Sequence, residues 1–153
     1  MRIFVDSGIL VEYQKGNNVD FYEELILREE ITLFVNQVVI SEFLYYFIAL
    51  SANKSPMSVK ETGQIANSFG QRNPLEMLPG FIHLGHNYKL AEKGFEFMKK
   101  YNLLPNDALI LASCVNNQIK QLATFDSDFN IPCEELGIKI LQKIDDLKNN
   151  GLK

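Results

Sequence analysis

Short apolar runs alternate along the chain with longer segments whose apolar residues recur at helical spacing. The runs lack the polar alternation of a strand with one face in water, which predicts strands covered on both faces of a parallel sheet. We expect these strands in the following ranges, the last being a candidate fifth: 2–5, 31–35, 81–84, 121–124 and 138–141.

The longer segments predict helices between the strands. Ser7 is the expected cap of the first helix and Asn36 that of the longest. The predicted helices cover the following ranges: 7–15, 20–30, 37–52, 87–101 and a segment that opens at 105–106. Strands that alternate with helices predict a three-layer α/β/α sandwich around a mainly parallel central sheet.

The helix predicted at 37–52 is apolar nearly all round, in the sequence VVISEFLYYFIAL. Such a helix is expected to be central or to lie against another subunit. Tyr45, Tyr46 and Phe47 belong to it, and aromatic side chains can stack on RNA bases. We favour a core or dimer contact for these three residues.

Residues 53–74 form the most polar part of the chain and predict an insert with one exposed helix that ends near Gly70. Lys54, Lys60 and Arg72 lie in this insert and are candidate contacts for an RNA backbone. The favoured alternative is an ordinary helix with a solvated surface.

Length and composition limit the classes of protein to which this chain can belong. A chain of 153 residues with 46% hydrophobic residues predicts one globular domain over 1–153. No apolar stretch approaches the roughly 20 residues of a membrane span, so we expect a cytoplasmic protein with no membrane partner. A net charge of −4 excludes a uniformly basic nucleic-acid binder.

Four acids stand where an ordinary core would not place them. Asp6 and Asp126 follow predicted strands, Asp107 opens a buried helix, and Glu42 interrupts the apolar helix. Ligands of open α/β sheets bind beyond the carboxyl ends of parallel strands, so we expect these acids to converge there.

Each acid also has a structural interpretation. Asp6 could cap a helix, Asp107 could favour a helix dipole, and Asp126 or Asp128 could form an Asx turn. Glu42 is harder to explain in this way, because burying it without a partner is costly.

A cluster of carboxylates requires a compensating charge. Two unit charges about 5 Å apart at an effective dielectric near 20 repel by roughly 3 kcal/mol. Either some acids are protonated or a divalent cation lies between them. Oxygen ligands favour Mg²⁺ or Mn²⁺, which support hydrolysis of phosphodiesters.

Four motifs, FVDSG, VISEF, PNDALILAS and LATFDSDF, resemble those of PIN-domain nucleases, particularly the VapC-like toxins of toxin–antitoxin pairs. The resemblance covers nearly the whole chain. It implies Asp6, Glu42, Asp107 and Asp126 as the catalytic metal site, with Thr124 and Asp128 as auxiliary residues. It also implies a Mg²⁺- or Mn²⁺-dependent endoribonuclease, a homodimer and a cognate antitoxin.

Two other functions remain open from the sequence. TFDSDF could be the DxD motif of a haloacid-dehalogenase-like phosphatase, although that chemistry places its acids after the first strand. A non-catalytic PIN-like subunit could instead receive a partner's arginine in the acidic pocket.

Overall fold

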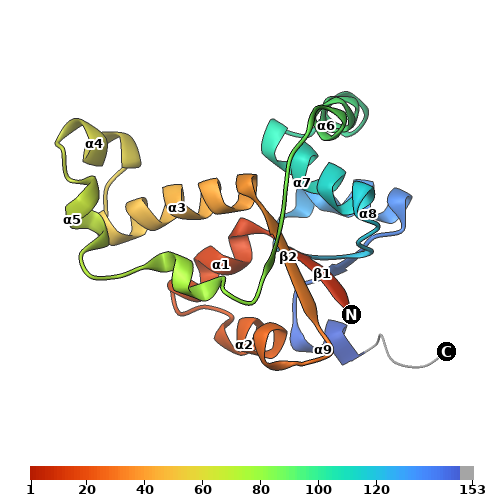
Figure 1. The fold of residues 1–153 in the computed structure, drawn as a ribbon, viewed down its shortest axis with the longest axis horizontal. Helices are drawn as coiled ribbons and strands as arrows, with labels where there is room; N and C mark the ends of the chain where they lie inside the picture. The colour runs from red at the N-terminus through yellow and green to blue at the C-terminus, as the bar shows by residue number, and fades with distance from the viewer. Residues whose placement is uncertain (149–153) are drawn as a thin grey trace.

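Five parallel strands form one sheet at the centre of the structure, a computed structural model that describes residues 1–148 (Figure 1). The order of the strands across the sheet is β3-β2-β1-β4-β5. Their bounds are β1 Arg2–Val5, β2 Thr32–Asn36, β3 Ile82–Leu84, β4 Gln121–Ala123 and β5 Lys139–Leu141. All five predicted strands are confirmed. Residues 149–153 of the predicted domain lie outside the described part of the chain.

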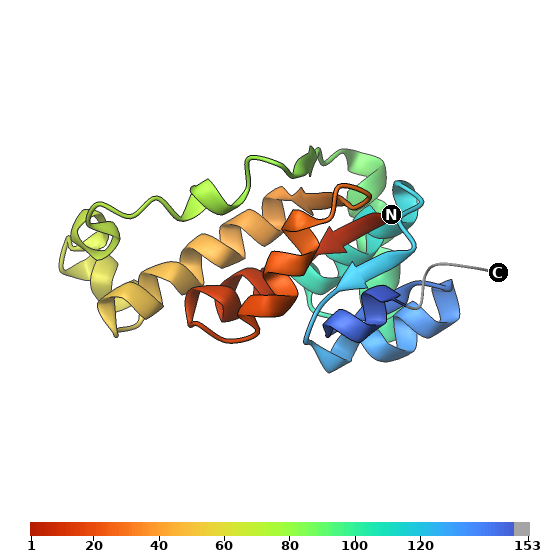
Figure 2. The ribbon, with the colours of Figure 1, turned by 90° about the horizontal axis from the view of Figure 1, so that it is seen from below.

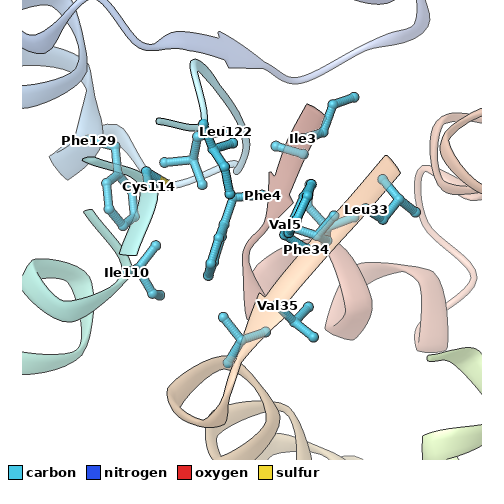
Figure 3. Close-up of a cluster of buried hydrophobic side chains, with 14 of the residues drawn as sticks. Ile3, Phe4, Val5, Leu33, Phe34, Val35, Ile110, Cys114, Leu122 and Phe129 are labelled. Carbon is cyan, nitrogen blue, oxygen red and sulfur yellow. The ribbon is translucent and has the colours of Figure 1, made fainter. Parts of the chain in front are cut away.

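The apolar runs form strands because they are covered on both faces. Ile3, Phe4 and Val5 of β1 are fully buried, and Figure 3 shows Phe4 between side chains of the neighbouring strands and helices. Phe4 pairs in register with Phe34 of β2 and Leu122 of β4. Each large side chain buried in this way contributes about 1.5–3 kcal/mol to stability.

Helices cover both faces of the sheet. In Figure 1, α2 and α9 lie on one side and α6 and α7 on the other. The three-layer α/β/α sandwich is therefore confirmed. The helices are α1 Ser7–Gln14, α2 Val19–Leu27, α3 Gln37–Ala52, α4 Pro56–Glu61, α5 Ile65–Phe69, α6 Tyr88–Tyr101, α7 Pro105–Asn116, α8 Asn130–Leu136 and α9 Ile144–Lys148. Within residues 1–148, no helix combines the length and apolar character of a membrane span.

One of the two predicted helix caps is correct. The Asn36 side chain accepts a hydrogen bond from the Val39 backbone N–H at 3.0 Å and caps α3 as expected. The predicted cap Ser7 is instead the first residue of α1, and Asp6 caps the helix by accepting from the Ser7 N–H at 2.7 Å.

The insert at 53–74 contains two short helices, so the prediction of one helix was wrong. Gly63 lies between α4 and α5 with a φ of +66°. A residue in this left-handed conformation cannot continue a right-handed helix, so α4 ends here. Glycine adopts the conformation readily because it has no Cβ. Figures 1 and 2 show α4 and α5 at the far end of α3, away from the sheet.

The strand order reverses between β1 and β4, which are direct neighbours in the sheet. Helices from β1 and β4 therefore depart in different directions, and a crevice opens beyond the carboxyl ends of these two strands. The backbone N–H of Asp6 donates to the carbonyl of Ala123 at 3.0 Å, so the two strand ends remain joined at this point.

Candidate functional site

A cavity of about 530 Å³ is lined by all four of the predicted acids, Asp6, Glu42, Asp107 and Asp126. Asp6 comes directly after β1, and Asp126 lies in the loop that follows β4. Glu42 lies on α3, and Asp107 lies in the first turn of α7. Segments far apart in the sequence thus place carboxylates in one pocket at the crevice.

Asp6 is the most deeply buried of these acids, with 6% of its surface exposed. Its Oδ1 accepts from the Ser7 N–H at 2.7 Å, and its Oδ2 accepts from the Thr124 hydroxyl at 2.8 Å. The pKa of Asp6 is raised to about 6, mainly by burial and to a smaller extent by the negative charges of Glu42 and Asp126. The two hydrogen bonds act in the opposite direction and limit the rise of this pKa.

Thr124 connects two of the acids. While its hydroxyl donates to Asp6, its Oγ1 accepts from the backbone N–H of Asp126 at 3.0 Å. The side chain is completely buried. Thr124 therefore fixes the position of Asp6 relative to the loop that carries Asp126.

Glu42 is held by two neutral donors that the sequence analysis did not identify as site residues. Its Oε1 accepts from the side-chain amide of Asn106 at 2.7 Å, and its Oε2 accepts from the Ser7 hydroxyl at 3.1 Å. These bonds and its partial exposure explain how a carboxylate is tolerated on an apolar helix. Glu42, Ser7 and Asn106 come from α3, α1 and α7, so the three helices meet at this carboxylate.

The pKa of Asp107 is raised more strongly than that of Asp6. Among the described residues, no donor forms a hydrogen bond with the Asp107 carboxylate. Partial burial and the charges of neighbouring acids together raise its pKa to about 7. Burial is the largest cause, and the neighbouring acids contribute in decreasing order Asp126, Asp6, Glu42 and Asp128.

Asp107, Asp126 and Asp128 each offer a carboxylate oxygen within 4.8 Å of the others. The Asp128 N–H donates to Asp126 at 2.8 Å, which holds the two residues in a fixed relation. An all-oxygen set with mutual repulsion fits a hard divalent cation, so the donor chemistry of this structure is consistent with a metal site. Within residues 1–148, Asp6 and Glu42 do not join this close group.

The basic residues predicted as RNA contacts do not line the cavity. Lys54 and Lys60 are exposed on the insert. The Arg72 guanidinium lies 5.0 Å from the centre of the Phe47 ring. An RNA-binding role for these three residues therefore stays a prediction.

The three aromatic residues of α3, Tyr45, Tyr46 and Phe47, differ in their exposure to solvent. Phe47 is buried in the core, with 2% of its surface exposed. Tyr45 and Tyr46 are 55% and 49% exposed, so a core position is wrong for them, whereas the alternative of a dimer contact stays a prediction. Tyr46 lines the acidic cavity together with Phe125. The spacing of four residues between Glu42 and Tyr46 was the available signal, because it places both on one helix face.

The comparisons with known proteins agree with this geometry. The PIN domain family model matches residues 3–134. Ribonuclease VapC2 of Methanocaldococcus jannaschii is 35% identical over 129 residues, which cover 84% of this chain and 87% of the relative. Ribonuclease VapC6 of the same organism is 29% identical over 144 residues, covering 84% of this chain and 90% of that protein.

A solved structure supports the same fold. A toxin–antitoxin complex from Klebsiella pneumoniae contains a chain that superposes with a TM-score of 0.57 at 17% identity, covering 92% of this chain and 96% of that one. The matching family model, the homologous VapC ribonucleases and the sheet with its acidic crevice lead to one conclusion. This chain belongs to the PIN-domain family.

Proposed function

We propose that this protein is a metal-dependent endoribonuclease that hydrolyses RNA phosphodiester bonds as the toxin of a toxin–antitoxin pair. The convergence of Asp6, Glu42, Asp107 and Asp126 on one cavity carries the proposal. The names of the two homologues, both ribonucleases of the VapC type, support the choice of RNA as substrate.

Mg²⁺ or Mn²⁺ is the proposed cofactor, held by Asp107, Asp126 and Asp128 with Asp6 and Glu42 beside them. When bound, such a cation activates water as a nucleophile and neutralises charge on the phosphodiester under attack. The oxygen-only donor set and the raised pKa values of Asp6 and Asp107 support this assignment.

The neutral residues around the acids hold the carboxylates in place. Ser7 and Thr124 hold Asp6, while Ser7 and Asn106 hold Glu42. Because these orientations exist before a substrate arrives, less free energy is needed to arrange Asp6 and Glu42 during the reaction.

The proposed partners are an RNA substrate, a second copy of the chain and a cognate antitoxin, and the proposed location is the cytoplasm. Structural relatives include a toxin–antitoxin complex, which supports an antitoxin partner. A dehalogenase-like phosphatase is disfavoured, because Asp126 follows β4 and the chain belongs to a different family.

Cleavage of labelled single-stranded RNA by the purified protein tests the proposal. We expect cleavage with Mg²⁺ or Mn²⁺ and none with excess EDTA. Asp107→Asn should reduce the rate by about 10²- to 10³-fold, as expected for loss of one electrostatic group at the reacting centre. Glu134→Gln, a change at an exposed acid outside the cavity, is the control and should retain full activity.

Calorimetry with Mn²⁺ separates the nuclease from a binding subunit that accepts a partner's arginine. A nuclease should bind Mn²⁺ in the free protein, and Asp107→Asn should weaken that binding. A folded protein that neither binds Mn²⁺ nor cuts RNA would overturn the proposed activity.

A further inference from the structure

The acidic cavity has an aromatic wall as well as a charged one. Tyr46 and Phe125 line it alongside the carboxylates. Phe125 is partly buried and packs against Phe21, with ring centres 6.3 Å apart. Tyr46 leaves 49% of its surface exposed. An aromatic ring is thus available to a ligand at the edge of the pocket where the acids lie.

The charge of the cavity is unfavourable for RNA. Five of its lining residues are acids, whereas Lys15 is its single lysine or arginine within the described chain. The Lys15 ammonium already pairs with Glu12 at 2.7 Å. A divalent cation would neutralise only part of this negative charge. Phosphate contacts with basic side chains therefore contribute little affinity here, and the strand needs another source of binding energy.

We propose that Tyr46 is a stacking platform for an unpaired base of the RNA strand next to the cleaved phosphodiester. This inference rests on the proposed ribonuclease activity and adds how the substrate is held. Stacking on an aromatic ring requires no basic residue and tolerates any base, because every base has a π-face. It does require a base that is not paired in a helix.

The position of the Tyr46 ring fits this role. Tyr46 lies four residues after Glu42 on α3, so the two side chains project from the same face of the helix. The Tyr45 ring packs edge-on against the Tyr46 ring, with ring centres 5.9 Å apart and an interplanar angle of 86°. This contact restricts the orientation of the Tyr46 ring before RNA binds. The base would therefore stack beside the carboxylates, not at a remote surface.

Substitution of Tyr46 gives the first test. Tyr46→Ala should raise the KM for single-stranded RNA by about 5- to 150-fold, the range expected for one stacked base. Tyr46→Phe retains the ring and should restore a KM near that of the wild type. Tyr88→Ala is the matched control, because Tyr88 is 78% exposed on α6 and does not line the cavity. An unchanged KM for folded Tyr46→Ala would overturn the inference.

An RNA with one base replaced by 2-aminopurine gives a second readout that does not depend on cleavage. A series of RNAs carries 2-aminopurine at successive positions around the cleaved bond. Binding of each RNA to the Asp107→Asn variant, which should cleave slowly, is followed by fluorescence in the presence of Mn²⁺. One position should show quenched fluorescence, and the additional change Tyr46→Ala should abolish the quenching. Quenching that persists without the Tyr46 ring would overturn the inference.

Two further outcomes are distinguishable. If wild-type protein cuts no RNA, the proposed activity itself fails. If the protein cuts RNA but Tyr46→Ala changes only the mass measured by light scattering, then Tyr46 is a contact between copies of the chain and the stacking inference fails alone.

Discussion

The hydroxyl of Thr124 donates a hydrogen bond to Oδ2 of Asp6 at 2.8 Å and joins the end of β4 to the end of β1. Both side chains are buried. The bond therefore links the most buried acid of the cavity directly to the core of the sheet.

Replacing Thr124 tests the importance of this bond for stability. Thr124→Val keeps the shape of the side chain but leaves a carboxylate oxygen of Asp6 and the Asp126 N–H without their partner. We expect the free energy of unfolding at pH 8 to fall by about 1–3 kcal/mol. Urea unfolding measures the loss, and Thr62→Val on the exposed insert is the control. A loss equal to that of the control would contradict the interpretation.

Asn106 should act through Glu42, because its amide donates to that carboxylate at 2.7 Å. Asn106→Ala should lower kcat/KM and the affinity for Mn²⁺ by about 10- to 100-fold, as is typical when a residue that orients a metal-site carboxylate is lost. Asn67→Ala removes a similar exposed amide on α5 and should change neither quantity. Full activity of Asn106→Ala would remove it from the site.

The raised pKa of Asp6, about 6 compared with the ordinary 3.8, predicts how stability depends on pH. The folded state binds this proton more tightly than the unfolded state, so the metal-free protein loses stability as pH rises from about 4 to about 6. The contribution of Asp6 is about 2–3 kcal/mol. Urea unfolding of wild type and Asp6→Asn in EDTA measures it, since the variant should lack this component. Parallel pH profiles for the two proteins would contradict the assignment.

Asp107 should reduce the stability of the metal-free protein, because its carboxylate lies among like charges without a hydrogen-bond donor in the described chain. We expect Asp107→Asn to melt at a higher temperature than wild type in EDTA at pH 8, by the equivalent of about 0.5–2 kcal/mol. Saturating Mn²⁺ should reverse the order, because it stabilises the protein that binds it more tightly. A variant less stable than wild type in EDTA would show that repulsion is not the dominant effect.

The sequence predicts the sheet well because its strands are buried on both faces and therefore appear as apolar runs. It misses α8 and α9, which lie where no periodic pattern stands out. It also joins α4 and α5 into one helix, because the composition of the segment does not reveal that the backbone is left-handed at Gly63.

The acids of the candidate site were predictable because strand ends of a parallel sheet meet at one edge. Their hydrogen-bond partners were not. Ser7 and Asn106 donate to Glu42 from positions 35 and 64 residues away, and such contacts depend on how three helices pack. Tyr46 was expected in a core or dimer contact and not at the site for a similar reason, since an apolar helix does not reveal which of its faces remains open.

Asp6 is buried and follows the core strand β1 directly, whereas Tyr46 lies on the exposed part of α3. Changes near the buried Asp6 thus disturb the packing of the sheet, while changes at exposed positions of α3 leave it intact. Efforts to retarget this protein to a new RNA should therefore vary the exposed positions of α3 and keep the strand ends unchanged.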